Sequence, residues 1–545
     1  MKIKIILGLV FIFAVSDLSS QSYQWWSARF SSPASGSQDT SVAIKQDNAG
    51  NIYVTGCVNG NNTGTDIILL KYNTVTGDTV WVRYYSSQGL NEDKATALEV
   101  DALGFVYLTG YTFQSSRDII TLKYDPAGNL VWAKTFNGSN NGGDYGLAIE
   151  IDAAGNVYVG GRSDDAGDQH FTAVKYSSAG TQLWASVYNG PLSRSFDQPD
   201  DITIDNNGNI YLAGFSTVMQ DLHTSDYLTV KFNSNGNLQW AKRYNGTADD
   251  EDAATGIIYV NSAVYVTGRT DSLNGNYNYF TIKYNDANGD SLKSAFYSGP
   301  PLRQIDNAVR IKADNAGNVY VTGLSMGVNN TFDYATVKYN SDLDLQWVSR
   351  FEGTGFDTPS DMVIAGSDIY VTGASDGVSS KDYLTVKYNS SGSEQWTMRF
   401  NAPAGENDFA SSVAVDQFEN VYVTGYAGVT GGENDIFTLR YSPVPIGVEP
   451  VSGSIPLSYK LYQNYPNPFN PSTNIRIDIP AGNDRYTKLE IFDVLGKLIS
   501  VPVNDDLKPG TYIVNWNASG TASGVLYYRL SSGDFIQTNK MILIK

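Results

Sequence analysis

The sequence predicts an all-β fold, and three observations support this. The chain of 545 residues is rich in Tyr (37) and Gly (52), which favours strands and turns over helices. One short motif, first seen as Ile52-Tyr53-Val54-Thr55-Gly56, occurs eight times, and its closing glycines are 50 to 55 residues apart. A strand-rich period of this length is typical of propeller blades, so we expect an eight-bladed β-propeller. Seven blades are the alternative, if one unit packs irregularly.

Each repeat predicts four strands in order. The first is short and apolar, as in 147–151, and a tight Asx-Gly turn joins it to the second, as in 157–161. The third and fourth are exemplified by 226–232 and 238–244, again joined by a tight turn. Asx and Gly supply the side-chain hydrogen bonds and positive φ that such turns need. The middle strands are apolar on both faces, as expected where each unit packs between two neighbours.

The ends of the repeat array predict how it closes. The eighth repeat stops after its third strand, at Tyr441, and lacks a fourth. Residues 26–30 match the fourth-strand segment 240–244 position for position. We therefore expect the N-terminal strand to complete the last unit and to close the ring.

The first twenty residues have the pattern of a secretory signal peptide. Lys2 and Lys4 precede an apolar stretch, 5–15, and small residues follow, with cleavage expected after Ser20. The apolar stretch is too short to span a bilayer, and no later run is long enough for a membrane helix. The mature chain is expected to have no transmembrane helix.

The repeats resemble a known family. Units such as 314–323 and 333–339 are similar to the bacterial β-propeller repeat (SBBP-type), and the resemblance covers roughly residues 24 to 441. It implies the propeller fold and hardly specifies an activity. We expect the propeller to occupy residues 21–441.

The C-terminal part predicts a small, separate β-domain. Prolines 443, 445, 450 and 456 mark a Pro-rich linker at 442–456. The remaining segment, 457–545, alternates like short antiparallel strands. About 85 residues of this kind predict an Ig-like β-sandwich. The expected strands are 474–479, 488–493, 510–516, 524–530 and 535–544.

This C-terminal segment resembles the type A sorting domain of the type IX secretion system. The matching stretches are 465–471, 491–496, 507–512, 523–530 and 540–545. The resemblance implies a Gram-negative source, Sec-dependent entry into the periplasm, and contact with the type IX secretion machinery. It also implies a secreted or outer-surface location, with possible removal of the domain and attachment of the cargo to surface lipopolysaccharide. An adhesive or sugar-binding sandwich is the alternative.

Composition excludes several function classes. The net charge is −19 with no basic run, which disfavours binding to nucleic acid. Cys57 is the only cysteine, so no intramolecular disulfide forms, and we expect a buried, inert thiol. His170 and His223 are the only histidines, too few for a zinc site of the usual kind. No catalytic residue and no cofactor are predicted.

One series of carboxylates is a candidate metal site. In every repeat an aspartate lies just before the first strand, 16 or 17 residues ahead of the glycine that closes the second strand. We expect each to cap nearby backbone N–H groups or the Thr of the Thr-Gly pair. The alternative is a ring of carboxylates that binds Ca²⁺ at the mouth of the channel. The series consists of Asp39, Asp93, Asp144, Asp197, Asp252, Asp306, Asp357 and Asp408.

Loop lengths predict which face carries function. The loops after the second and fourth strands are longer and more varied than the tight turns at the other end. Variable loops on a rigid scaffold are the usual binding surface, and here they carry Tyr111, Phe113 and Phe215. The sequence favours a secreted or surface-bound, non-catalytic propeller that binds an unknown glycan or protein. The alternative is a carboxylate-dependent polysaccharide hydrolase or lyase acting on the same face.

Overall fold

The structure is a computed structural model that describes most of residues 23–544. The residues outside the description are 1–22, 35, 61–63, 88–90, 166, 191–194, 219–220, 247–250, 273–275, 301–304, 444–447, 453–454, 483–485 and 545. The predicted signal peptide therefore lies outside the described residues. Within them the fold is all-β, with a single 3₁₀ turn, η1 (Ser139–Asn141), and no helix long and apolar enough to cross a membrane.

The first four repeats each form four consecutive antiparallel strands, and we number the repeats as units 1 to 4. The strands of units 1 to 4 are β2 (Thr40–Gln46), β3 (Ile52–Gly60), β4 (Gly64–Tyr72) and β5 (Thr79–Tyr85); β7 (Lys94–Val100), β8 (Val106–Phe113), β9 (Arg117–Tyr124) and β10 (Leu130–Phe136); β11 (Asp144–Ile151), β12 (Val157–Asp165), β13 (Asp168–Tyr176) and β14 (Gln182–Tyr188); and β15 (Ser195–Ile204), β16 (Ile210–Val218), β17 (Asp221–Phe232) and β18 (Leu238–Tyr244). One further short strand, β6 (Asn91–Glu92), lies between units 1 and 2 in sequence and pairs with β4.

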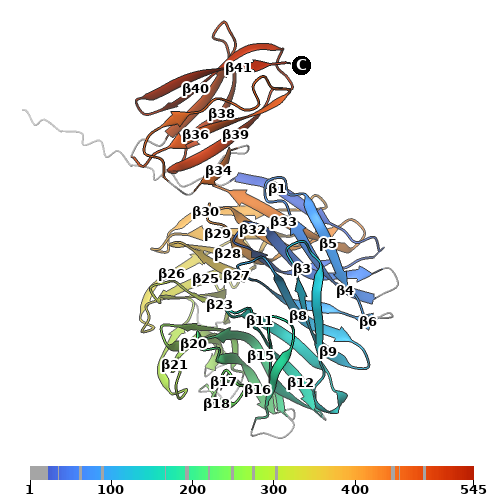
Figure 1. Ribbon diagram of the computed structural model, residues 1–545. Coiled ribbons are helices and arrows are strands. Elements are labelled where there is room, and N and C mark those ends of the chain that lie inside the picture. The colour runs from blue at the N-terminus through green and yellow to red at the C-terminus, as the bar shows by residue number, and fades with distance from the viewer. Residues whose placement is uncertain are drawn as a thin grey trace, which may run out of the picture.

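Units 5 to 8 follow the same order, except that unit 8 takes its fourth strand from the start of the chain (Figure 1). Their strands are β19 (Ala253–Val260), β20 (Ala263–Ser272), β21 (Asn276–Asn285) and β22 (Ser291–Tyr297); β23 (Asp306–Ala313), β24 (Val319–Met326), β25 (Phe332–Tyr339) and β26 (Leu345–Phe351); β27 (Asp357–Ala365), β28 (Asp368–Asp376), β29 (Lys381–Tyr388) and β30 (Glu394–Phe400); and β31 (Asp408–Val415), β32 (Val421–Val429), β33 (Glu433–Ser442) and β1 (Tyr23–Phe30).

The N-terminal strand pairs as the sequence predicts. β1 runs antiparallel to β33, and Trp26 lies opposite Arg440. In unit 4, Trp240 lies opposite Lys231 in the same register. A four-stranded sheet is thus assembled from the two ends of the repeat array, more than 370 residues apart in sequence.

In six of the eight units, all but units 5 and 7, an aspartate holds the tight turn between the first two strands. In unit 3, Asp152 accepts hydrogen bonds from the backbone N–H groups of Ala154 and Asn156, at 3.0 and 2.9 Å. Its other oxygen accepts from the Asn156 side chain at 2.8 Å and from the Tyr158 hydroxyl at 3.1 Å. This network fixes the turn and explains the Asp-x-x-Gly-Asn pattern, since Gly155 takes φ of +76°.

Neighbouring units are joined by the same hydrogen bonds at several junctions. The fourth-strand tryptophan donates its indole N–H to a turn carbonyl of the next unit, as from Trp184 to Ser234 at 2.9 Å. The basic residue of the third strand lies over a tyrosine ring of its own unit and also donates to a turn carbonyl of the next unit, as from Lys123 to Ser178 at 3.0 Å. The last unit makes both contacts with the first: Trp26 and Arg440 donate to Thr74, at 3.0 and 2.7 Å.

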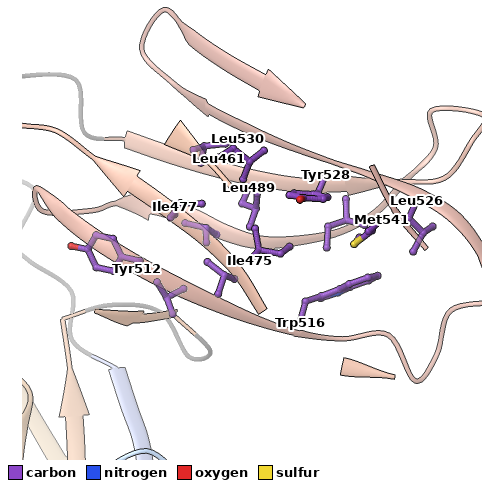
Figure 2. Close-up of a cluster of buried hydrophobic side chains, with 14 of the residues drawn as sticks. Leu461, Ile475, Ile477, Leu489, Tyr512, Trp516, Leu526, Tyr528, Leu530 and Met541 are labelled. Atoms are coloured by element: carbon purple, nitrogen blue, oxygen red, sulfur yellow. The ribbon is translucent and has the colours of Figure 1, made fainter. Parts of the chain in front are cut away.

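The C-terminal region forms two antiparallel sheets. One sheet has the order β34–β39–β36–β35 and the other β38–β37–β40–β41. The strands are β34 (Val448–Ser452), β35 (Lys460–Leu461), β36 (Ser472–Ile479), β37 (Tyr486–Phe492), β38 (Leu498–Asp506), β39 (Gly510–Asn517), β40 (Gly524–Ser532) and β41 (Phe535–Leu543). Side chains from both sheets form one buried core, with Ile475 and Tyr512 facing Leu489 and Tyr528 (Figure 2).

The structure differs from the sequence prediction in this region. Val448–Ser452 lie within the predicted Pro-rich linker, yet they form β34, because Val448 is fully buried in the core and the strand pairs with β39. β38 was not predicted either, since most of its side chains are exposed. The C-terminal region also contacts the repeats: the Tyr23 hydroxyl donates a hydrogen bond to Asp505, Lys508 pairs with Glu419, and Trp25 packs against the C-terminal core.

Candidate functional site

The eight predicted aspartates are all fully buried, one at the start of each unit. Each accepts hydrogen bonds from the loop that precedes its strand or from the second strand. Asp144 accepts from the Gly138 N–H at 2.6 Å, and Asp93 accepts from the Ser87 N–H at 2.5 Å and from the Thr112 hydroxyl. The hydroxyl comes from the residue two positions after the closing glycine, not from the Thr of the Thr-Gly pair as expected.

Burial affects the protonation of these caps. It raises the pKa of both Asp144 and Asp408 to about 6. Among the described residues, no three His, Cys, Asp or Glu side chains are grouped as a metal site would require. The caps act within single units, and the ring of eight carboxylates that binds Ca²⁺ stays the alternative hypothesis.

Cys57 has the surroundings of an inert thiol. It is 5% exposed, and burial raises its pKa to about 11. The nucleophilic thiolate is therefore absent at neutral pH.

A strip of arginine and aromatic side chains crosses units 2 to 4, at the end of the units that carries the long loops. It lies near the ends of the second strands and the starts of the first strands. Tyr111 and Arg162 lie in the last part of β8 and β12, and Tyr145 is the second residue of β11. All of its members are partly exposed. We call this set the Arg–aromatic strip; it comprises Tyr111, Arg117, Tyr145, Arg162, Phe196 and Phe215.

The rings and guanidinium groups of the strip alternate in space. Tyr111 and Tyr145 meet edge to face with centroids 5.0 Å apart. The Arg162 guanidinium lies over the Tyr145 ring at 4.4 Å and over the Phe196 ring at 5.2 Å. Phe196 in turn stacks on Phe215 at 5.6 Å. Cation–π contacts of this kind hold the flat groups in fixed orientations.

One carboxylate lies next to the strip. Gln198 accepts a hydrogen bond from Arg162 Nη1 at 2.8 Å, and its amide donates to Asp200 at 3.1 Å. Asp200 has exposed surface, but the protein around it weakens the solvation of its charged form and raises its pKa to about 6. The charge of Asp201 adds to the increase, whereas Arg310 and Arg269 oppose it. Side chains from units 3 to 6 thus converge around Asp200.

A second group of charges lies on the first strands of five units, β2, β7, β11, β23 and β27. Lys45 pairs with Glu99, and Arg310 lies 3.5 Å from Asp361. Burial and the charge of Glu99 raise the pKa of Glu150 to about 8. Burial lowers the pKa of Lys45, but the carboxylates of Glu99, Glu150 and Asp361 raise it above its ordinary value. These groups belong to units 1, 2, 3, 6 and 7, so charges from units far apart in sequence affect one another.

Sequence reasoning found only part of this arrangement. It predicts Tyr111, Phe113 and Phe215 on this face but no arginine. Tyr145 and Arg162 follow the capping aspartate and the closing glycine of the same unit, and these two positions vary in type between repeats. Their departure from the repeat pattern is the signal that could have identified the strip.

Two surface pockets lie at the opposite end of the units, beside the tight turns. One, of about 380 Å³, is lined by Asp47, Asp416 and Arg440, and the other, of about 470 Å³, by Asp101, Lys123 and Asp152. Their carboxylates already hold the turns. Both pockets are therefore part of the scaffold that joins neighbouring units.

Comparison with known families identifies two segments of the chain. Residues 463–545 match the family described as "Secretion system C-terminal sorting domain", and residues 395–433 match the "Beta-propeller repeat" family. Both resemblances seen in the sequence are thereby confirmed. A sorting domain of the type IX system implies secretion to the cell surface or the surrounding medium. No curated protein matches the chain.

Several solved structures are similar at low identity. Polysaccharide lyase Uly1 is 12% identical, with a TM-score of 0.39, and the match covers 74% of this chain and 89% of the lyase. A protein of unknown function from Dyadobacter fermentans is 10% identical, with a TM-score of 0.35, over 77% and 99%. PorZ, a surface component of the type IX secretion system of Porphyromonas gingivalis, is 13% identical, with a TM-score of 0.21, over 91% and 85%. Values this low carry no inference about activity.

Proposed function

We propose that the protein is an exported, closed, eight-bladed β-propeller that binds an extracellular glycan at the Arg–aromatic strip. The proposed parts are a signal peptide (1–20), the propeller (21–441), a linker (442–456) and an Ig-like sorting domain (457–545), with β34 added to the last. The type IX machinery would recognise the sorting domain. Removal of that domain, followed by attachment of the propeller to surface lipopolysaccharide, is part of the proposal.

Three sets of contacts support a closed ring of eight blades. The indole and third-strand contacts described above recur from one unit to the next and also join unit 8 to unit 1. The third set links the innermost strands: Ser360 donates to the Ala410 carbonyl at 2.7 Å, and Ser411 donates to the Ser41 carbonyl at 2.7 Å. An open array would leave the first and last units without these partners.

The strip is the single observation that supports binding. Aromatic rings have negative faces that attract the polarised C–H groups of a sugar ring, and guanidinium groups donate several hydrogen bonds in one plane. Here Tyr145 and Phe196 present such rings on either side of Arg162, on strands of a rigid scaffold. Partly exposed rings interleaved with polar groups favour a glycan over a flat protein surface.

A glycan array tests this proposal. The mature protein, residues 21–545, is applied to the array beside a Tyr145→Ala variant. We expect discrete glycans to bind the parent and to be lost or weakened at least tenfold in the variant. A Trp81→Ala variant, changed on the outer strand β5 of unit 1, is the control and should bind like the parent. Failure of the parent to bind any glycan would contradict the proposal.

A carboxylate-dependent hydrolase or lyase is the second candidate function. Asp200 favours it, because an acid with a pKa of about 6 beside a sugar-binding strip is suited to general acid–base chemistry. Incubation with a panel of polysaccharides, with reducing ends and unsaturated products both measured, separates the two functions. Turnover that is lost in Asp200→Asn would establish catalysis.

A further inference from the structure

We infer that the glycan bound at the strip is acidic, and that Arg162 binds its carboxylate or sulfate group. This inference deepens the proposed function and rests on it.

Arg162 differs from the arginines near it. Arg117 pairs with Glu92 at 3.1 Å, Arg269 with Glu251 at 2.7 Å, and Arg310 with Asp361 at 3.5 Å. Within the described part of the chain, Arg162 has no carboxylate partner; its contacts are two aromatic rings and the amide oxygen of Gln198. A guanidinium carries five N–H donors, and most of these stay available here.

The environment of Arg162 strengthens its attraction for an anion. The rings of Tyr145 and Phe196 displace water from two sides of the guanidinium, and its Nε atom is buried with no hydrogen-bond partner among the described residues. A charge that is poorly hydrated and not neutralised gains most from a bidentate contact with a carboxylate or sulfate. The protein as a whole carries a net charge of −19, so a positive group held free on the binding face is a local exception.

The ring faces argue for a sugar that bears the anion. A small anion would need only the guanidinium. The strip continues away from Arg162 on both sides, through Tyr145 to Tyr111 and through Phe196 to Phe215. An extended chain of sugar rings can lie along these faces while one anionic substituent contacts Arg162. Gln198, held between Arg162 and Asp200, offers an amide to a sugar hydroxyl.

Asp200 limits this binding when it is ionised. Its carboxylate lies one amide group away from Arg162, and Asp201 adds a second negative charge. Arg310 offsets both charges in part, and Arg269 offsets that of Asp200. An anionic glycan therefore binds more weakly above the pKa of Asp200 than below it. We expect its affinity to increase as the pH falls from 7 to 5.

The experiment compares acidic and neutral glycans on the mature protein. An array holding uronate-containing, sulfated and neutral oligosaccharides is probed first, and the best acidic oligosaccharide is then titrated by calorimetry. Sodium sulfate and a poly-glutamate peptide are titrated in parallel. The variants are Arg162→Gln, which removes the charge, and Arg162→Lys, which retains it without the planar donors. Arg83→Gln is the control, because Arg83 stacks on Trp81 at 5.1 Å in unit 1, away from the strip.

We expect acidic oligosaccharides to bind at least tenfold more tightly than neutral ones of the same length. Arg162→Gln should remove this preference, Arg162→Lys should retain part of it, and Arg83→Gln should change the affinity less than twofold. Each variant is checked for an unchanged melting temperature, and Arg162→Lys serves if Arg162→Gln fails to fold.

Three outcomes would overturn the inference. Neutral glycans that bind as tightly as acidic ones, with loss in Tyr145→Ala, would leave the proposed function standing and refute only the acidic preference. Binding of sulfate or of poly-glutamate as tight as that of the best oligosaccharide would show an anion or peptide site in place of a glycan site. Failure of every glycan to bind would refute the proposed function itself.

Discussion

Replacement of Trp26 by Ala tests whether the N-terminal strand holds the first and last units together. The indole packs near Tyr72 of unit 1 and Tyr422 of unit 8, with centroids 6.3 and 6.2 Å away, and donates to the Thr74 carbonyl. Removal of a partly buried Trp should cost about 2–3 kcal/mol, and the lost hydrogen bond about 1 kcal/mol more.

These values translate into a measurable melting shift. Unfolding entropy of about 2.1 cal/mol/K per residue gives roughly 0.9 kcal/mol/K for a propeller of about 420 residues. If the ring unfolds as one cooperative unit, Trp26→Ala should lower its melting temperature by about 4 °C in scanning calorimetry. Trp184→Ala is the matched control, because Trp184 makes the same contact between units 3 and 4, at 2.9 Å. A fall of about 4 °C for Trp184→Ala with less than about 1 °C for Trp26→Ala would refute a closed ring.

Three further predictions follow from buried ionisable groups. Since the pKa of Glu150 is raised to about 8, the stability that its protonated form contributes is present at low pH and is lost as the pH rises through that value. Glu150→Gln should therefore raise the melting temperature relative to the parent at pH 9 and lose this advantage at pH 5. A difference in melting temperature that does not change with pH would contradict this. The Cys57 thiol should resist a disulfide reagent at pH 8 until the protein is unfolded, so rapid labelling of the folded protein would be inconsistent with its burial. Titration of Ca²⁺ into chelator-treated protein should give neither heat nor a rise in melting temperature, because the eight aspartates already accept hydrogen bonds within their own units. A saturable heat signal would instead support a Ca²⁺-binding ring of carboxylates.

The repeat architecture could be predicted because its signals are local. Asp152, Gly155 and Asn156 specify a turn within five residues, and the same pattern recurs along the chain. The pairing of β1 with β33 could also be predicted, since residues 26–30 repeat the fourth-strand pattern. Strands with exposed faces could not be predicted from the sequence. β38 has little apolar periodicity, and the buried side chain that anchors β34 is that of Val448.

The strip could not be predicted from local signals. Its members come from six strands, β8, β9, β11, β12, β15 and β16, and lie up to about 100 residues apart in sequence. The register between the paired strands brings them together. The protonation of Glu150 also depends on Lys45 and Lys312, which belong to units 1 and 6. Such groupings follow from the arrangement of the repeats and not from any one repeat.

Hydrogen–deuterium exchange of the mature protein, with and without a glycan that binds it, tests the location of the site most directly. We predict slower exchange in 143–146, 161–164 and 195–200, where the strip and Gln198 lie, and unchanged exchange in the tight turns at 47–51 and 101–105 at the opposite end. Protection confined to the tight turns, or to the C-terminal sheets, would contradict the assignment of binding to the Arg–aromatic strip.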